Sequence, residues 1–289
     1  MRYLPLLLLV ACNKQDDSPL PQKQQRTASA EVYTAPISNY WYNNTLDDSI
    51  RVSLTSAIAD IDWMDRNRIT SSNQYASLYI SSSLIRSASF PSAVAYASQR
   101  GIRLGLAYSQ TSQIDDLLAY NNGKPADQKL VYAITELEPW NTGDYAGMTN
   151  KMQYATPRLH ANGLKHLVYI GWPTSSYYPT IVTNADEVNL HCYRTSDNMN
   201  LSGMWGYVQA RLNILAQEAA NQGKILPVNI IYSCEPAFAY SWFNKHSWKD
   251  AHMAFQTVYE QRATQQMKQW LRINNFSIFV TKYAHQIKP

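Results

Sequence analysis

Short apolar runs with β propensity alternate along the chain with segments whose apolar residues recur at helical spacing. Residues 102–108, IRLGLAY, are typical of a buried strand. The clearest helix has one apolar stripe and a glycine stop at Gly223; the stripe consists of Val208, Leu212, Leu215 and Ala219. In all, strands are predicted over residues 31–38, 76–82, 102–108, the first half of 130–141, 165–171, 187–193, 226–235 and 276–283.

Helical segments are predicted between most of these strands. One begins near residue 47, one opens at Pro91 and ends at Gly101, and one runs from Ser112 to an Asn-Asn-Gly stop at 121–123. A fourth carries an apolar stripe of Met148, Met152, Ala155 and Leu159, and a long helix is expected over residues 248–273. Helical spacing therefore connects strand to strand along the chain.

This alternation predicts an α/β protein with a parallel sheet, and eight such units predict a closed (β/α)8 barrel, the TIM-barrel architecture. The competing fold is an open doubly wound sheet, but no glycine-rich turn follows the first strand, so no dinucleotide cofactor is expected. The chain ends at Pro289, six residues after the eighth predicted strand. The barrel is therefore expected to lack its last helix; either the N-terminal segment or the long seventh helix would cover that side, or the barrel would be incomplete.

The N-terminus carries a targeting signal. Arg2 precedes a short apolar run at residues 4–10, and residues 9–12, LVAC, resemble the cleavage box of bacterial lipoproteins. The resemblance implies a signal peptide over 1–11, lipidation of Cys12, a polar tether over 12–30, and a barrel domain over 31–289. Residues 13–17, NKQDD, resemble the signal that sends lipoproteins to the cell surface. We therefore expect a protein anchored by lipid in a bacterial outer membrane, with a plain secretory signal as the alternative.

Composition narrows the classes of function. The net charge is only +4 and the basic residues are scattered, so no nucleic-acid partner is expected. Tyrosine and tryptophan, at 21 and 8 residues, outnumber the 6 phenylalanines, which suits stacking on sugars as well as half-buried packing. No CxxC or HExxH spacing is present, so no metal site is expected. Cys192 and Cys234 could pair in an oxidising envelope or remain buried thiols.

Candidate chemistry begins in residues 130–141, LVYAITELEPWN. Side chains alternate along a strand, so Glu136 and Glu138 point the same way, directly before Trp140. In a parallel barrel this places two carboxylates at the C-terminal mouth, where active sites lie. The alternative is that they are solvated loop charges.

Other strand ends supply further polar and aromatic residues. Collected at the mouth are Trp41, Tyr108, Glu136, Glu138, Trp140, Trp172, His191, Tyr193, Glu235 and Lys282, with Asn189 on the same face as His191. Trp41, Tyr108, Trp140, Trp172, Asn189, His191 and Tyr193 are predicted to bind substrate. The alternative for Asn189 and His191 is a satisfied polar layer in the barrel core, and for the two tyrosines ordinary packing.

The positions of Glu138 and Glu235, after the fourth and seventh strands, resemble the acid/base and nucleophile of retaining glycoside hydrolases of the four/seven barrel superfamily. That resemblance implies two carboxyl groups about 5 Å apart and a glycosyl-enzyme intermediate. Glu136 would help to keep Glu138 protonated by like-charge repulsion. Trp140 and Trp172 would stack on sugars. The superfamily has Asn before the strand-four acid, where this chain has Leu137.

A second resemblance is to chitinase-like barrels, which end strand four in an acidic ladder and use a tyrosine after strand six. Glu138 would then be the acid, Glu136 would replace the preceding Asp, and Tyr193 would match the tyrosine. Val131 and Ile134 occupy the other two acidic positions, so a catalytically inactive relative is an alternative. The main prediction is a glycoside hydrolase without cofactor; the alternatives are a non-catalytic surface glycan-binding lipoprotein and an envelope adhesion protein with a filled barrel mouth.

Overall fold

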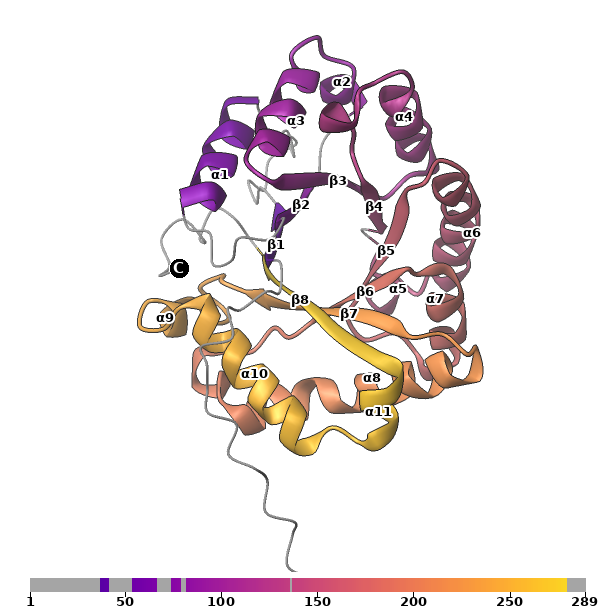
Figure 1. Ribbon diagram of the computed structural model, residues 1–289. Coiled ribbons are helices and arrows are strands. Elements are labelled where there is room, and N and C mark those ends of the chain that lie inside the picture. Colours follow the sequence, from indigo (N-terminus) through magenta and orange to yellow (C-terminus); the bar gives the residue numbers. More distant parts are fainter. Residues whose placement is uncertain (1–36, 42–53, 67–73, 79–81, 136, 280–289) are drawn as a thin grey trace, which may run out of the picture. The chain divides into compact units, whose positions relative to one another are not determined.

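Eight parallel strands close into a barrel. The structure, a computed structural model, describes residues 37–41, 54–66, 74–78, 82–135 and 137–279. Each strand pairs in parallel with the next, and the last pairs with the first. The strands are β1 (Ile37–Trp41), β2 (Gln74–Leu78), β3 (Ile102–Tyr108), β4 (Tyr132–Thr135), β5 (Lys165–Ile170), β6 (Glu187–His191), β7 (Leu226–Ser233) and β8 (Leu271–Phe279) (Figure 1). The predicted (β/α)8 barrel is confirmed.

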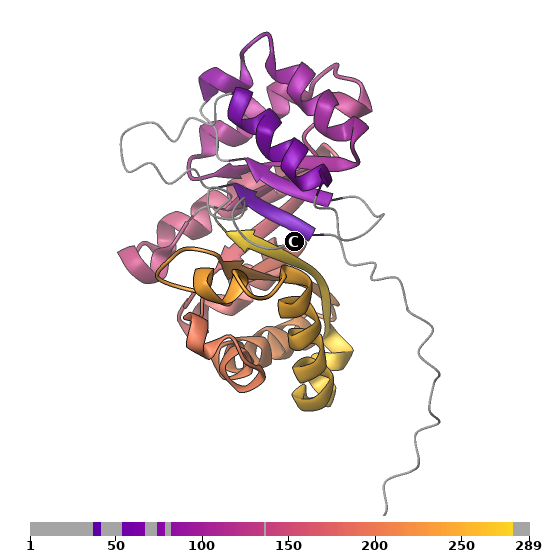
Figure 2. The same cartoon turned by 90° about the vertical axis from the view of Figure 1, so that its left-hand side faces the viewer.

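Helices surround this barrel, as Figures 1 and 2 show. They are α1 (Leu54–Arg66), α2 (Ser82–Ile85), α3 (Phe90–Gln99), α4 (Thr111–Asn121), α5 (Pro139–Thr142), α6 (Tyr145–Ala161), α7 (Tyr178–Asn184), α8 (Leu201–Asn221), α9 (Tyr240–Phe243), α10 (Trp248–Arg262) and α11 (Gln265–Trp270). In the described part of the chain, no helix combines the length and apolar character needed to cross a bilayer.

Several predicted boundaries are wrong. The long helix over 248–273 is two helices, because Thr264 adopts an extended conformation and its side chain caps α11 by accepting from the Met267 N–H. Strand β8 consequently begins at Leu271 rather than 276. Strands β6 and β7 end before Tyr193 and Glu235, which lie in the loops at the mouth. Residues 1–36 and 280–289, with the predicted signal peptide, tether and missing last helix, lie outside the described residues.

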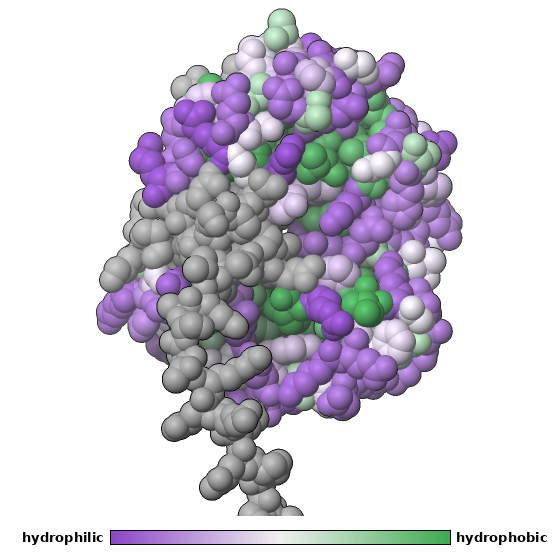
Figure 3. Space-filling model, in the orientation of Figure 1, coloured by the Kyte–Doolittle hydropathy of each residue, from purple (hydrophilic) through white to green (hydrophobic). Residues whose placement is uncertain are grey.

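The predicted helical stripes form the layer between helices and sheet. Met148, Met152, Ala155 and Leu159 of α6 are buried, as are Val208, Leu212, Leu215 and Ala219 of α8. Each large apolar side chain buried in this way contributes roughly 1.5–3 kcal/mol. The exposed residues of these two helices are mostly polar, and the described residues on the face shown in Figure 3 are mostly hydrophilic, with some hydrophobic patches (Figure 3). The helices therefore bind the barrel through one face only.

The Tyr132 side chain, at the start of β4, fills part of the barrel interior. A Cβ added at Gly105 of the neighbouring strand β3 would lie 2.2 Å from the Tyr132 ring, so the ring crosses where only glycine leaves room. The Tyr132 hydroxyl lies 2.9 Å from Oγ of Ser77 on β2. The Tyr132 ring therefore spans the interior from β4 to β2.

Candidate functional site

A group of aromatic rings lies at the C-terminal ends of β4, β5 and β6. We call it the aromatic cup and define it as Trp140, Tyr169, Trp172, His191, Tyr193 and Tyr207. The centroid of His191 lies 6.0 Å from that of Tyr169, 6.1 Å from Trp172, 4.8 Å from Tyr193 and 5.7 Å from Tyr207. Trp140 joins through Tyr169 at 5.9 Å. The imidazole therefore contacts rings from three chain segments: the end of β5, the loop after β6, and α8.

His191 is the buried polar residue at the centre of the aromatic cup. Its side chain is 8% exposed, and neither ring nitrogen has a hydrogen-bond partner among the residues that the structure describes. Burial, assisted by the positive charge of Arg211, lowers the pKa of His191 to about 3. The imidazole is therefore neutral near pH 7 and offers one donor and one acceptor. Since buried polar groups are normally paired, an unpaired one at a barrel mouth indicates a place for a ligand.

Two tryptophans form the accessible part of the cup. Trp172 follows β5 and is 48% exposed, which is high for an indole. Trp140 is half-buried, and its ring lies against the backbone of Gly171, where an added Cβ would be 2.7 Å from Cε2. The predicted sugar platforms are thus brought together at adjacent positions of the mouth.

Glu235 follows β7 and is half-buried. The hydroxyl of Ser233 donates to Oε2 of Glu235 at 2.9 Å and accepts from the Glu235 backbone N–H at 3.2 Å. Ser233 shares the inward face of β7 with Ile231, which packs inside the barrel. The carboxylate is therefore held at the mouth by an inward-facing side chain.

The loops after β6 and β7 are tied together. Ser196 donates its N–H and its hydroxyl to the carbonyl of Phe238, at 3.0 and 3.1 Å. The same hydroxyl accepts from the Trp242 N–H at 3.1 Å. Phe238 in turn packs on Tyr193, with ring centroids 5.5 Å apart. These bonds place Tyr193 and Glu235 on two loops that are fixed to one another.

Glu138 follows β4 and is exposed. It occupies the N-cap position of α5, before Pro139, and its Oε2 accepts from Nδ2 of Asn141 at 2.7 Å. Strands β5 and β6 separate β4 from β7 in the barrel, and parallel strands open to the same end. Glu138 and Glu235 therefore both follow strands that open to one mouth of the barrel.

Three of the predicted site residues lie outside the described residues: Cys12, Glu136 and Lys282. Trp41 ends β1, where the backbone registers with Leu78 of β2.

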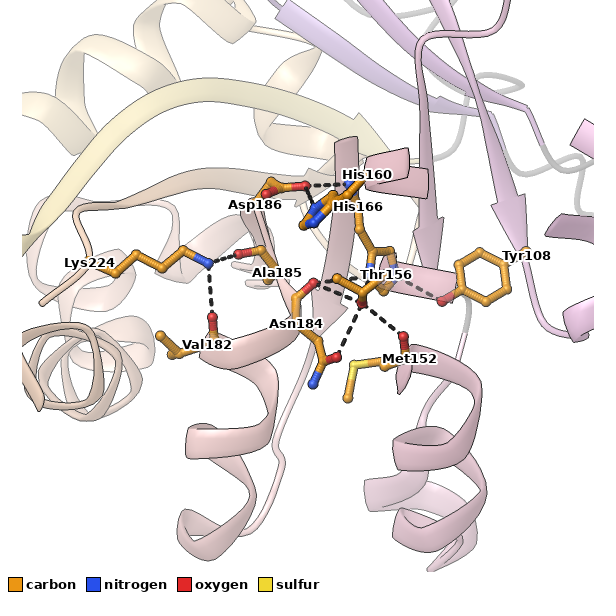
Figure 4. A network of polar contacts seen from close by, with 10 residues as sticks. All are labelled: Tyr108, Met152, Thr156, His160, His166, Val182, Asn184, Ala185, Asp186 and Lys224. Atoms are coloured by element: carbon orange, nitrogen blue, oxygen red, sulfur yellow. Dashed lines mark hydrogen bonds and ion pairs between the residues drawn. The ribbon is translucent and has the colours of Figure 1, made fainter. Parts of the chain in front are cut away.

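Tyr108 corrects the prediction. It is fully buried, and it lies on the outer face of β3 with Leu104 and Leu106, against the helices. Figure 4 shows it beside His166, whose Nε2 accepts from the Tyr108 hydroxyl at 2.7 Å (Figure 4). A side chain on the outer face cannot contact a ligand at the mouth, so Tyr108 is a packing residue.

The network behind Tyr108 fixes the tautomer of His166. Nδ1 lies 3.0 Å from the carbonyl oxygen of Asn184, and a carbonyl can only accept, so Nδ1 carries the hydrogen. The Thr156 hydroxyl, 2.8 Å from Nδ1, donates to the Met152 carbonyl. Burial lowers the pKa of His166 to about 4. The imidazole is a neutral strut joining α6, α7 and β5 (Figure 4).

Asn189 is also misassigned as a substrate contact. It is 3% exposed, and its Oδ1 accepts a hydrogen bond from Nδ2 of Asn229 at 3.0 Å. The same Nδ2 also donates to Oγ of Ser277 at 2.6 Å. These side chains of β6, β7 and β8 form a closed polar layer in the barrel, two residues below His191. The core-layer alternative holds for Asn189, whereas His191 has no hydrogen-bond partner within the described ranges.

Cys192 and Cys234 are both buried, and no disulfide joins them to one another. Burial raises the pKa of the Cys192 thiol to about 12, so it is protonated and unreactive near pH 7. Over the described ranges, no three His, Cys, Asp or Glu side chains gather closely enough to hold a metal ion.

Sequence reasoning missed Tyr169, Tyr207 and Arg211. Tyr169 shares the inward face of β5 with Leu167 and could have been found from the strand period. Tyr207 and Arg211 lie on α8, where the helical pattern marked only the apolar stripe. No local signal indicates that these two residues reach the barrel mouth.

Sequence comparisons find no relatives: no protein-family model matches the chain, and no curated protein matches it. Comparison with solved structures finds proteins of similar fold. The chain is similar to an active-site mutant of the beta-1,3-glucanosyltransferase of Rhizomucor miehei in complex with laminaritriose, with a TM-score of 0.50, 12% identity, and 84% of this chain and 86% of that one covered.

A second structure of a Rhizomucor miehei beta-1,3-glucanosyltransferase, of glycoside hydrolase family 17, matches with a TM-score of 0.45, 11% identity, and coverage of 68% and 71%. A chitinase from Chromobacterium violaceum matches with a TM-score of 0.44 and 11% identity, and the match covers 87% of this chain and 97% of that one. At such identities the likeness concerns the fold. The predicted resemblance to glycoside hydrolase barrels is therefore confirmed for the architecture.

Proposed function

We propose that this protein is a glycoside hydrolase whose sugar-binding site is the aromatic cup and whose catalytic carboxylates are Glu138 and Glu235. The observation that carries the proposal is His191, a buried imidazole with both nitrogens unpaired, next to the half-exposed indole of Trp172. A sugar ring matches this environment, because its C–H faces pack on aromatic rings and its hydroxyls both donate and accept hydrogen bonds.

The catalytic step divides between two loops. Glu138, after β4, would protonate the leaving glycosidic oxygen, while Glu235, oriented by Ser233, would attack the anomeric carbon. Water would then hydrolyse the glycosyl-enzyme, with Glu138 acting as base. The support is their placement after strands four and seven of a glycoside hydrolase-like barrel, as in the superfamily that the sequence resembles.

Neutral glucans are the first substrates to test. Laminaritriose accompanies the Rhizomucor miehei transferase, and the neutral state of His191 suits uncharged hydroxyls. A release assay would compare laminarin, chitin oligosaccharides and other polysaccharides. Glu138→Gln and Glu235→Gln should each lower turnover by orders of magnitude, whereas Glu260→Gln on the exposed side of α10 should leave it unchanged. Equal turnover in all variants would exclude the proposed carboxylates.

A non-catalytic glycan-binding protein is the second candidate, and the environment of Glu138 favours it. That carboxylate is exposed and bonded to Asn141, whereas a general acid usually lies in an apolar, shielded place. A binder would retain the glycan without releasing products, and Glu138→Gln would not alter its affinity. Trp172→Ala should weaken binding in both cases, so this variant tests the cup independently of chemistry.

The unpaired His191 and exposed Trp172 also argue against an adhesion protein with a filled mouth.

The proposed location is the outer surface of a bacterial outer membrane, with a lipid on Cys12. The support is the sequence: Arg2, the apolar run 4–10 and the Cys12 box. Cells supplied with a palmitate analogue should label the wild type and not Cys12→Ala, and protease added to intact cells should remove the anchored protein. Labelling of the alanine variant would contradict this assignment.

A further inference from the structure

Arg211 lies on α8, outside the barrel, and reaches the end of strand β5. Its side chain is 2% exposed, and Nη1 donates to the carbonyl of Gly171 at 2.8 Å. Its guanidinium carbon lies 4.0 Å from the ring centroid of Trp172 and 4.8 Å from that of Tyr207. One planar cation therefore bonds to the backbone before Trp172 and stacks on the indole itself.

The same backbone carries the second tryptophan. The Trp140 ring lies against the Cα of Gly171, where a Cβ would approach Cε2 to 2.7 Å. Gly171 is thus contacted by Trp140 from the end of β4 and by Arg211 from α8. A displacement of Gly171 would move the Trp172 platform and remove the surface on which Trp140 rests.

Arg211 is a cation buried outside the barrel. Within the described residues no carboxylate lies within 4.0 Å of its guanidinium, and its Nε has no hydrogen-bond partner. Burial lowers the pKa of the Arg211 guanidinium. Burying an uncompensated guanidinium is unfavourable. Packing alone would be served equally by an apolar side chain, so the planar donor geometry is what this position uses.

Two other arginines repeat the local motif, but their side chains do not bond to the end of β5. Arg100 stacks on Tyr96 at 3.4 Å and Arg158 on Tyr154 at 3.7 Å, each donating to the carbonyl of that tyrosine four residues earlier. Arg211 does the same to the Tyr207 carbonyl, at 2.8 Å. Of these three arginines, Arg211 is the one that continues to Gly171 and Trp172. Arg158, which is exposed, therefore provides a matched control within the same chain.

We propose that Arg211 is the positioning residue of the sugar-binding site, holding the Gly171–Trp172 backbone so that Trp140 and Trp172 form one fixed aromatic platform. The inference rests on the proposed function in naming the platform a sugar site. Arg211 is too buried to contact the sugar, so it acts through the tryptophans.

The test is fluorine NMR of protein labelled with 5-fluorotryptophan, which requires no substrate. Resonances are assigned with Trp140→Phe and Trp172→Phe. In Arg211→Met, both resonances should move from their wild-type positions and broaden, whereas in Arg158→Met they should stay. Arg211→Lys retains the charge but lacks the planar fork, so it should move both resonances in the same sense. This milder variant decides the test if the methionine variant does not fold.

A lower melting temperature with both resonances unmoved in folded Arg211→Lys would overturn the proposal and leave Arg211 a stabilising residue. A second readout applies when turnover on laminarin is detected: Arg211→Lys should raise KM about tenfold with a smaller change in kcat, because the platform and not the carboxylates is disturbed. A kcat lowered about tenfold with an unchanged KM would contradict the positioning role. If no glycan is bound or cleaved, the proposed function fails while the fluorine spectra still decide the role of Arg211.

Discussion

The hydroxyl of Ser233, which faces the barrel interior, bonds to both the carboxylate and the backbone N–H of Glu235. This pair links the last residue of β7 to the predicted nucleophile. Ser233→Ala should lower kcat about tenfold, because the carboxylate would sample orientations unsuited to attack. The measurement is initial-rate kinetics on the best substrate of the release assay. Ser176→Ala, on an exposed turn after β5, is the control, and an unchanged kcat in Ser233→Ala would show that Glu235 needs no such support.

Gly171 is expected to tolerate no side chain. In Gly171→Ala the new Cβ would overlap the Trp140 indole, so the ring must move or the strand end must shift. Glycan affinity should fall about tenfold and Trp140 fluorescence should change. Gly206→Ala on α8 is the matched control: nothing lies within 4 Å of its added Cβ, and a helical alanine should raise stability by about 0.5–1 kcal/mol. Identical binding by Gly171→Ala and wild type would contradict the packing described.

Gly105 and Tyr132 give a test of the barrel interior. In Gly105→Ala the Cβ would lie within 2.4 Å of three ring atoms of Tyr132, and the free energy of unfolding should fall by about 1–3 kcal/mol. Tyr132→Phe keeps the ring and removes only the bond to Ser77, so it should lose about 1 kcal/mol. Urea denaturation measures both. A Gly105→Ala variant as stable as wild type would mean that the ring can leave the interior.

His166 should make the fold sensitive to acid. The unfolded imidazole titrates near 6.5 and the folded one near 4, so between these values the unfolded state binds more protons. The stabilisation is therefore complete above pH 6.5 and is lost as the pH falls toward 4, by a total on the order of 3 kcal/mol. His166→Gln should show a shallower dependence of unfolding free energy on pH over this window.

Nitrogen-15 spectra provide the direct check on the same residue. Wild-type His166 should remain neutral with its hydrogen on Nδ1 from pH 7 to pH 5, because Asn184 accepts from Nδ1 and Tyr108 donates to Nε2. Protonation of this ring near pH 6.5 would show that the buried network does not exclude the charged form.

Local periodicity was sufficient to predict the architecture. The stripes of α6 and α8 and the run at 102–108 are local patterns, and their alternation allows few folds other than a parallel barrel. The same counting placed Glu138 and Glu235 after strands four and seven, because every strand end of such a barrel opens to one mouth. Apolar spacing does not predict the break at Thr264, because the signal there is a capping side chain.

Facing direction required the tertiary structure. A barrel strand is buried on both sides, so IRLGLAY does not reveal that Ala107 faces inward while Tyr108 faces the helices. Arg211 illustrates the same limit over a longer range, since it bonds to a carbonyl 40 residues away. Sequence alone determined the order and period of the elements, because hydrogen bonding and amphipathicity act over a few residues. Only the closed barrel decided which side chains meet at its mouth, because that depends on register between strands distant in the chain.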